Sequence, residues 1–243
     1  MATKLGVSVT VLEAAPRVLA RVASPTLSSF YEQAHRERGV QIRTATTVRR
    51  LEERDGCIEV VMDDGARIEV DAVVAGVGLA PNAEVAEEAG LEVADGIVVD
   101  ERCNTSDPDI VAAGDCTQHY NGFLDRRTRI ESVGNAVEQA RVAAATICGH
   151  PARYDAVPWF WSDQYEFKLQ MAGVRAEDDE VVLRGSTQGT DFSILYLRNG
   201  VLSAVDAINR PHEFMAAKRL IAARASVNAV RLTDESIPLT HAA

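Results

Sequence analysis

Asp115 is the residue whose surroundings most clearly suggest chemistry. It follows a turn at 105–108, a short apolar run at 110–113 and a glycine, in the order T-S-D-P-D-I-V-A-A-G-D. The apolar run predicts a short buried strand that ends at the glycine. Ligands of open α/β sheets bind beyond the carboxyl ends of the strands, where a carboxylate can accept hydrogen bonds from the hydroxyls of a sugar or polyol. An ordinary strand end with a helix-capping Asp explains the same spacing.

Composition narrows the class of protein. The 243 residues suit one large domain or parts of two, and 47% of them are hydrophobic, which is typical of a globular core. The net charge of -11 disfavours nucleic acid as a partner. No apolar run approaches the roughly 20 residues that span a bilayer. The N-terminus lacks the apolar region of a secretory signal. We therefore expect no membrane association and a cytoplasmic location.

Metal binding is not expected. The four cysteines are widely spaced and form no C-x-x-C, and the five histidines form no H-E-x-x-H. Without zinc-like or disulfide spacing, the cysteines are interpreted as reduced, small apolar residues.

The first part of the chain predicts alternating strands and helices. Ser24 and Pro25 begin a helix that Gly39 closes, and Asp64-Gly65 is a strong hairpin signal. Strands are expected at 7–12, 40–43, 48–53, 57–62, 67–70, 71–77 and 96–99, with a short helix at 82–90.

A long helix is expected at 132–148, with apolar positions at Val133, Val137, Ala140, Ala144 and Ile147. After Pro151 the pattern changes to antiparallel strands at 181–184, 192–198 and 201–209, with a turn at Asn199-Gly200. A helix from 211 to about 225 follows, and the tail to Ala243 is expected to be mobile. The fold class is thus α/β and α+β.

Two motifs carry a family resemblance. The run that ends at Asp115 resembles the second flavin-binding motif of flavoprotein reductases with two dinucleotide-binding domains. The stretch P-W-F-W-S-D-Q-Y, followed by K-L-Q-x-A-G, resembles the opening of the C-terminal domain of oxygenase-coupled NADH:ferredoxin reductases, the putidaredoxin reductase-like family. The resemblance extends from V-T-V-L-E-A-A-P-R to I-N-R-P-H-E-F-M, which is nearly the whole chain.

The resemblance implies an FAD site. Asp115 would bond the ribityl chain after Gly114, and Ser132 and Val133 would bring a helix N-terminus to the anionic edge of the flavin. Glu131 would contact the nicotinamide or modulate hydride transfer. Trp161 is the first choice for the tryptophan beside the isoalloxazine, and Trp159 is the second. Their alternative role is that of core or interface anchors.

The resemblance also implies NAD and a ferredoxin partner. Glu13, at the end of V-T-V-L-E, would bond the adenine-ribose hydroxyls and favour NAD over NADP, although Arg17 and Arg21 nearby could accommodate a 2′-phosphate. Gly78 is a further candidate contact for the cofactors. Three arginines are candidate contacts for an acidic ferredoxin, or else belong to a solvated loop: Arg126, Arg127 and Arg129.

One departure from the family is plain: no G-x-G-x-x-G occurs. Complete members carry one for FAD and one for NAD, so we expect an N-terminally truncated chain. Residues 1–78 would be the C-terminal part of the NAD-binding domain, 79–150 that of the FAD-binding domain, and 151–243 the C-terminal reductase domain. Two alternatives stay open. The chain is an inactive fragment or a half that needs a separate N-terminal part, or it is a disulfide-reductase-like member of the same superfamily.

Overall fold

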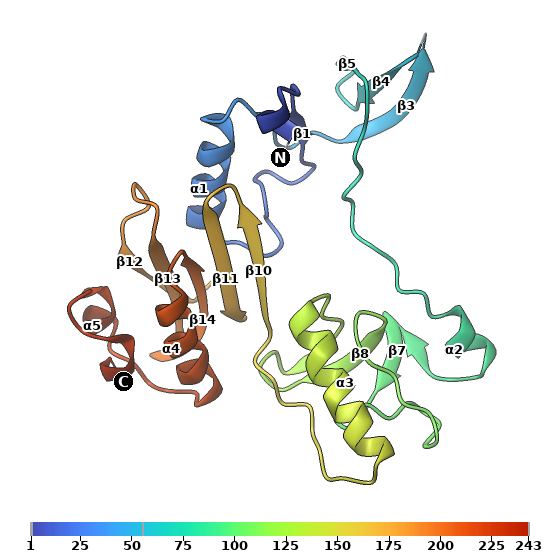
Figure 1. The fold of residues 1–243 in the computed structure, drawn as a ribbon, viewed down its shortest axis with the longest axis vertical. Coiled ribbons are helices and arrows are strands. Elements are labelled where there is room, and N and C mark those ends of the chain that lie inside the picture. The colour runs from blue at the N-terminus through green and yellow to red at the C-terminus, as the bar shows by residue number, and fades with distance from the viewer. Residues whose placement is uncertain (1, 55, 243) are drawn as a thin grey trace. The chain divides into compact units, whose positions relative to one another are not determined.

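The computed structural model describes residues 2–54 and 56–242, and the chain divides into two compact units, Met1–Gly78 and Leu79–Ala243 (Figure 1). Each unit combines parallel and antiparallel strands with helices, which confirms the predicted fold class. The units are described one at a time.

The first unit begins with a βαβ arrangement. Strand β1 (Thr10–Leu12) pairs in parallel with β2 (Gln41–Arg43), and α1 (Pro25–Arg36) connects them, after a short 3-10 helix, η1 (Ala2–Leu5). The Ser24 hydroxyl accepts a hydrogen bond from the Leu27 amide at 3.3 Å, so the predicted N-cap is confirmed. The first strand is shorter than the predicted 7–12, because only its last three residues pair with β2.

A three-stranded meander follows. Strands β3 (Val48–Arg54), β4 (Cys57–Met62) and β5 (Arg67–Val70) pair antiparallel in chain order. Gly65 has a φ of +84°, which suits the tight turn between β4 and β5. The predicted hairpin is confirmed.

The predicted strand at 71–77 is wrong. These residues form no strand, and Val74 and Val77 are 96% and 93% exposed. The apolar pattern is that of a strand, but a strand also needs a neighbour to satisfy its backbone amides. No strand pairs with this segment within the part of the chain that the structure describes.

The second unit opens with α2 (Glu84–Glu88) and a four-stranded sheet. Its strands are β6 (Val93–Ala94), β7 (Gly96–Val99), β8 (Thr117–Asn121) and β9 (Arg126–Thr128). The pair β7–β8 is parallel, and the other neighbours are antiparallel. Strands β8 and β9 were not expected from the sequence.

The predicted strand at 110–113 is also wrong. Val111 makes a single antiparallel bridge with Asn104, and Ala112 donates a hydrogen bond to the Cys103 carbonyl at 3.0 Å. The amides of Val111 and Ala113 point away from Asn104, to the opposite edge of the run. They have no hydrogen-bond acceptor among the described residues. The run is apolar and packs inward, but it has a neighbour on one edge only.

Helix α3 (Val133–Ile147) follows β9. Ser132 is its N-cap, and the Ser132 hydroxyl accepts a hydrogen bond from the Asn135 amide at 3.1 Å, as predicted. The buried face of α3 includes Asn135, Gln139 and Val142. The five apolar positions that indicated the helix lie on the opposite, exposed side.

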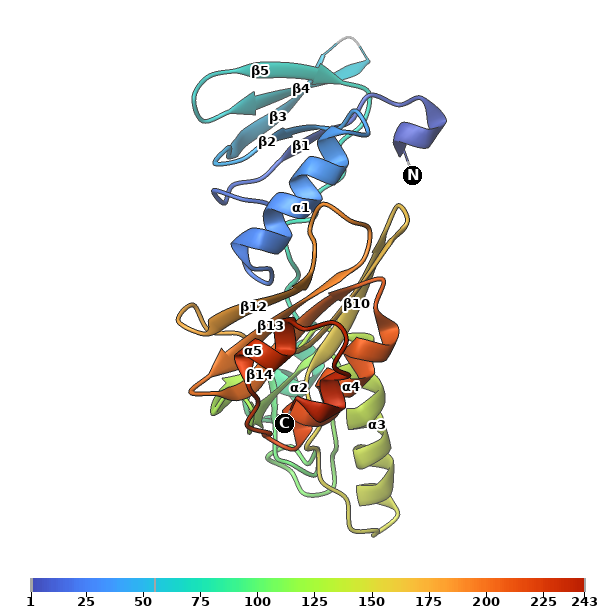
Figure 2. The same cartoon turned by 90° about the vertical axis from the view of Figure 1, so that its left-hand side faces the viewer.

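The C-terminal part of the second unit is a five-stranded antiparallel sheet of order β10-β11-β14-β13-β12. The strands are β10 (Trp159–Gln164), β11 (Phe167–Gly173), β12 (Glu180–Gly185), β13 (Phe192–Arg198) and β14 (Val201–Ile208). Asn199 and Gly200 form the predicted turn, with φ of +53° and +75°. Helix α4 (Pro211–Ala222) covers one face of this sheet (Figure 2).

The expectation of a mobile tail is wrong. Residues beyond α4 form α5 (Ala229–Thr233) and the 3-10 helix η2 (Leu239–His241), and Leu232, Leu239 and Ala242 are buried in the core beside α4. The Arg184 guanidinium on β12 donates hydrogen bonds to the backbone carbonyls of Leu232, Asp234 and Ile237 at 2.7–2.9 Å. Apolar burial and these hydrogen bonds, together with the ion pair of Arg210 and Glu235 at 2.6 Å, hold the tail in place.

Candidate functional site

Gly114 lies against the first turn of α3, and Asp115 follows it in the chain. Gly114 has a φ of +91°, and a Cβ built there would meet the Ala136 side chain at 3.6 Å. Asp115 is exposed, and its carboxylate has no hydrogen-bond or ion-pair partner among residues 2–54 and 56–242. Ser132, and not Asp115, caps α3. The ordinary explanation of Asp115 as a capping residue of this helix is therefore wrong.

A buried polar network holds this turn in place. The Gln139 amide oxygen accepts hydrogen bonds from the Gly114 amide at 2.7 Å and from the Thr117 hydroxyl at 2.8 Å. The Gln139 amide nitrogen lies 3.1 Å from Nδ1 of His119, and the Tyr154 hydroxyl donates to Asn135 at 2.7 Å. Side chains on the buried face of α3 thus fix the backbone turn that carries Asp115.

His119 is neutral within this network. Burial lowers the pKa of His119 from 6.5 to about 4. Its Nε2 is buried and has no hydrogen-bond partner in the described part of the chain, and its ring lies edge-on to Tyr154 with centroids 4.7 Å apart. Burial likewise raises the pKa of Tyr154 to about 12. Neither side chain carries charge at neutral pH.

The burial of His119 predicts acid sensitivity. Since the unfolded chain binds this proton near pH 6.5 and the folded chain only near pH 4, stability is complete above pH 6.5 and falls as the pH decreases to 4. The loss attributable to His119 is about 3 kcal/mol. Urea unfolding of the chain and of His119→Leu at several pH values measures it. The variant should have a flatter pH dependence between 4 and 6.5, and equal slopes would contradict the prediction.

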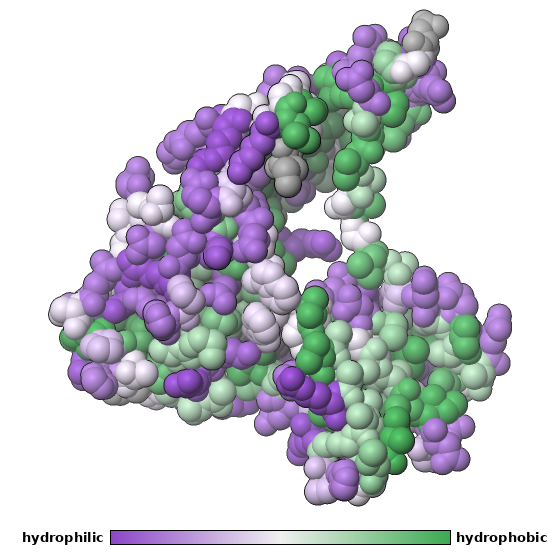
Figure 3. Space-filling view, viewed as in Figure 1, coloured by the Kyte–Doolittle hydropathy of each residue, from purple (hydrophilic) through white to green (hydrophobic). Residues whose placement is uncertain are grey.

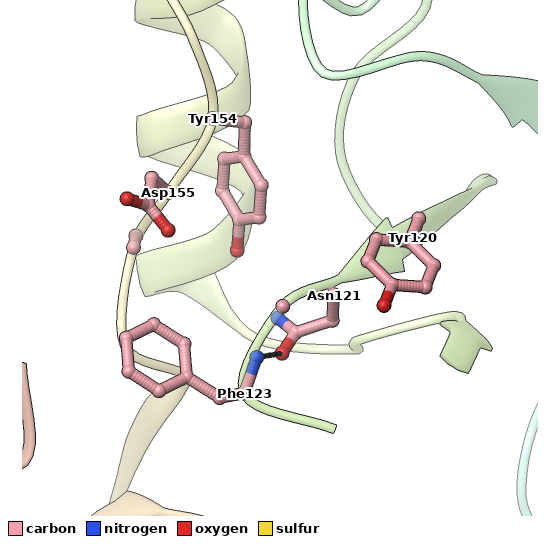
Figure 4. Close-up of a pocket in the computed structure, with 7 residues that line it drawn as sticks. Tyr120, Asn121, Phe123, Tyr154 and Asp155 are labelled. Carbon is pink, nitrogen blue, oxygen red and sulfur yellow. Dashed lines mark hydrogen bonds between the residues drawn. The ribbon is translucent and has the colours of Figure 1, made fainter. Parts of the chain in front are cut away.

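A small pocket adjoins the network, between β8 and the segment after α3 (Figure 4). Tyr120, Asn121 and Phe123 line one side, and Tyr154 and Asp155 the other. The Asn121 side chain accepts a hydrogen bond from the Phe123 amide at 3.0 Å. The cavity volume of about 10 Å³ is close to that of one water probe, so no cofactor ring fits there.

The two tryptophans stack beside the N-terminus of α3. Their ring centroids lie 5.4 Å apart at an interplanar angle of 27°. A Cβ at Gly134 would lie 2.5 Å from Nε1 of Trp159, so this glycine permits the close approach of the indole to the helix. The Lys218 ammonium lies 4.6 Å from the centroid of Trp159. Trp161, 45% exposed, is the outer member of the pair.

Glu131 is engaged with a neighbouring arginine. Its carboxylate accepts a hydrogen bond from the Arg129 guanidinium, which also pairs with Asp95 at 3.1 Å. Arg129 is mostly buried and therefore not a free docking group. Arg126 and Arg127 are exposed on β9, so the alternative that places them in a solvated loop is wrong.

Glu13 and Gly78 belong to the first unit. Glu13 directly follows β1, as predicted, and its carboxylate accepts a hydrogen bond from the Ala15 amide at 2.8 Å. Gly78 has a φ of +98° and lies in an exposed segment. The predicted site residues of the second unit lie around the N-terminus of α3: Gly114, Asp115, Ser132, Val133 and the two tryptophans.

Sequence reasoning missed the network behind Asp115. The signal was present: Asn135 and Gln139 are two amides at i and i+4 on a helix whose other positions are mostly apolar. Lys218, which covers Trp159, had no comparable signal because α4 is distant in the sequence.

Within the described ranges, no helix is both long and apolar enough to cross a membrane. The same residues hold no cluster of three metal-ligating His, Cys, Asp or Glu side chains.

Comparison with known families covers most of the chain. Residues 1–140 match the model of the pyridine nucleotide-disulphide oxidoreductase family, and residues 159–243 match the family model described as reductase C-terminal.

Individual proteins are similar over nearly the whole length. Putidaredoxin reductase CamA of Pseudomonas putida is 48% identical over 98% of this chain. The ferredoxin reductase subunit of 5,5'-dehydrodivanillate O-demethylase from a Sphingobium species is 45% identical, also over 98%. The matches span only 57% and 58% of these relatives, so the chain has less than two thirds of their length.

Solved structures agree. The putidaredoxin reductase of a covalent complex with putidaredoxin aligns with a TM-score of 0.90 at 48% identity, over 96% of this chain and 57% of that one. The ferredoxin reductase for the CYP199A2 system of Rhodopseudomonas palustris aligns with a TM-score of 0.94 at 38% identity, over 99% and 60%. The chain belongs to the pyridine nucleotide-disulphide oxidoreductase family, with putidaredoxin reductase-like ferredoxin reductases as its relatives.

Proposed function

We propose that this chain is part of an FAD-dependent NADH:ferredoxin oxidoreductase that serves an oxygenase system. The observation that carries the proposal is the convergence of Asp115, the N-terminus of α3 and the stacked tryptophans in one unit. The relatives named above are ferredoxin reductases, which does not favour the disulfide-reductase alternative.

The residues present fit the flavin end of FAD. The exposed Asp115 carboxylate, which no described group satisfies, suits the ribityl hydroxyls. The first amides of α3, after Ser132 and at Val133, are free by helix geometry and favour negative charge at the flavin edge. Bound FAD would supply the chemistry that links two-electron to one-electron transfer. No glycine turn for its pyrophosphate occurs in this sequence.

The tryptophans and Glu131 would complete that end of the site. Trp159 and Trp161 would exclude water beside the ring, with Trp161 on the solvent side. The carboxylate of Glu131, held by Arg129, would border the nicotinamide.

NAD and ferredoxin complete the proposal. Glu13, at the end of β1, would accept hydrogen bonds from the adenine-ribose hydroxyls of NAD, with Gly78 as a further contact. Arg126 and Arg127, exposed on β9, would attract an acidic ferredoxin. Residues 1–78, 79–150 and 151–243 would be parts of the NAD-binding, FAD-binding and reductase domains, in a cytoplasmic protein.

Spectroscopy tests the function. The chain is purified with FAD, alone and with the N-terminal polypeptide that its relatives carry, and the visible spectrum is recorded. We expect a flavin spectrum that bleaches with NADH without oxygen and recovers when a [2Fe-2S] ferredoxin is added. A bound flavin that NADH does not bleach would refute the proposal.

Asp115→Ala tests the binding role. Because hydrogen bonds to a charged group contribute roughly 1.5–3 kcal/mol, FAD affinity should fall about tenfold to a hundredfold. Titration of flavin fluorescence in the flavin-binding assembly measures it. Asp109→Ala, an exposed acid in the preceding turn, is the control. Equal affinities for the two variants would remove Asp115 from the site.

A further inference from the structure

Arg17 lies in the segment that connects Glu13, at the end of β1, to helix α1. Its guanidinium donates hydrogen bonds to the Ala23 carbonyl at 2.8 Å, the Ala20 carbonyl at 3.0 Å and the Ser28 hydroxyl at 2.6 Å. An arginine that recognises a phosphate commonly does so through two parallel N–H groups. Here both terminal nitrogens already donate to acceptors of the chain itself.

The Ser28 hydroxyl extends these contacts to the start of the segment. It donates a hydrogen bond to the Val18 carbonyl at 2.6 Å, and Ser28 is only 1% exposed. The surface over α1 is largely hydrophilic in Figure 3, so the helix turns its polar side to solvent and this serine inward. Because the hydroxyl is buried, water does not compete for its bonds with Arg17 and Val18.

The backbone between these contacts is strained. Leu19 has a φ of +56°, in the left-handed region that favours glycine. Its carbonyl accepts hydrogen bonds from the Val22 amide at 3.0 Å and the Ala23 amide at 2.9 Å, which closes a tight turn. Strained backbone persists where the surrounding structure holds it, and it is frequent at ligand-binding segments. Arg17 holds this turn through the Ala20 and Ala23 carbonyls.

A separate set of bonds fixes the chain around Glu13. The Glu13 carboxylate accepts a hydrogen bond from the Ala15 amide, and the Ala15 carbonyl accepts one from the Ala45 amide, both at 2.8 Å. The Glu13 carbonyl accepts a hydrogen bond from the Thr46 amide at 3.0 Å. The loop after β2 thus fixes the first residues beyond the strand, and Arg17 fixes the turn that follows them. Together they determine the path of the chain beside the Glu13 carboxylate.

We propose that Arg17 is a positioning residue for nucleotide selection, which holds the turn after Glu13 and does not itself bind a 2′-phosphate. The inference rests on the proposed function for the identity of the ligand, NAD, whose adenine-ribose hydroxyls Glu13 would bond. Arg21, in the same turn, is exposed and has no hydrogen-bond or ion-pair partner anywhere in the two described ranges. A 2′-phosphate at this turn would therefore meet Arg21 and not Arg17.

Chemical modification of the full chain, without nucleotide, is the first test. Phenylglyoxal condenses with the terminal nitrogens of a guanidinium, and mass spectrometry of the peptides gives the rate at each arginine. Arg21 should react about tenfold faster than Arg17 or more, because the nitrogens of Arg17 are engaged. This measurement needs no variant. Equal rates would show that the Arg17 guanidinium is free and would overturn the proposal.

Amide hydrogen exchange of the full chain is the second test. In Arg17→Gln and Arg17→Lys, exchange at Val22 and Ala23 should accelerate by about tenfold or more, since neither side chain offers the paired donors of a guanidinium. Arg49→Gln removes an exposed arginine from β3 of the same unit and should leave these rates within about twofold. Unchanged exchange in Arg17→Gln would show that the turn persists without this side chain, against the proposal.

Steady-state kinetics of the flavin-binding assembly connects the turn to nucleotide selection. Arg17→Gln should raise the KM for NADH and for NADPH by the same factor, about tenfold, and leave kcat within about twofold. In a Glu13→Gln background, the same substitution should change the KM for NADH by less than about twofold, because the carboxylate that it positions is gone. A rise for NADPH alone that Arg17→Lys reverses would identify Arg17 as a phosphate contact and overturn the proposal.

The outcomes are distinct from those of the spectroscopic experiment. A bound flavin that NADH does not bleach refutes the proposed function, whereas modification and exchange are measured on the chain without nucleotide. Slow modification of Arg17, with faster exchange in its variants, would support its role in the turn even then.

Discussion

Replacement of Arg184 by methionine is expected to lower the free energy of unfolding of the second unit by about 4 kcal/mol. The side chain of Arg184 is 3% exposed, and its Nε donates to Glu213 at 2.7 Å. Its other nitrogens donate to backbone carbonyls of α5 and the residues after it. Methionine fills similar space but leaves several backbone carbonyls without this donor. It also removes one donor from the Glu213 carboxylate, which keeps Ser193 and Arg210 as partners. Urea unfolding gives the loss, and limited proteolysis beyond α4 shows where it acts.

Two further substitutions serve as comparisons for Arg184→Met. Arg184→Lys keeps the charge but has a single nitrogen, so it should recover only part of the lost stability. Arg231→Met removes an exposed arginine from α5 and should change stability by less than about 0.5 kcal/mol. If Arg184→Met were as stable as Arg231→Met, the hydrogen bonds of Arg184 would not be what orders the C-terminal segment.

Gln139→Leu is expected to cost about 3 kcal/mol, because buried polar groups lose their partners. The Gly114 amide has Gln139 as its acceptor, and Nδ1 of His119 loses the neighbouring amide. The turn that carries Asp115 should loosen. Amide hydrogen exchange at Gly114 should therefore accelerate, in addition to the loss measured by urea unfolding.

Glu138→Gln is the matched control for Gln139→Leu. It lies on the same helix and removes a surface pair with Arg141, which should change stability by less than about 0.5 kcal/mol. Unchanged exchange at Gly114 in the leucine variant would show that the network does not hold the turn.

Local signals predicted the elements that need few distant partners. Ser24-Pro25 begins α1, and the turns at Gly65 and Asn199-Gly200 join antiparallel strands as expected. Strand β8 was not predicted because its buried residues are polar: Thr117, His119 and Asn121. Its inward face therefore shows no pattern of apolar residues. The runs at 71–77 and 110–113 were predicted as strands but do not form them. Their apolar pattern is strong, but a strand also requires a partner.

The candidate site was predictable in part. The position of Asp115 after a glycine, and the cap at Ser132, followed from turn and capping chemistry. The stacking of Trp159 on the helix could not be predicted, because it depends on Gly134, which has no distinctive local pattern. The first unit's Glu13 stays a prediction based on family resemblance.

The unpaired run 71–77 has a practical consequence for the isolated chain. Val73, Val74 and Val77 are exposed in a segment rich in β-forming residues, with Asp71 as its only charge. Such segments join edge to edge between molecules and nucleate aggregates. We therefore expect these few residues to determine the solubility of the purified chain. Val74→Lys should reduce its precipitation.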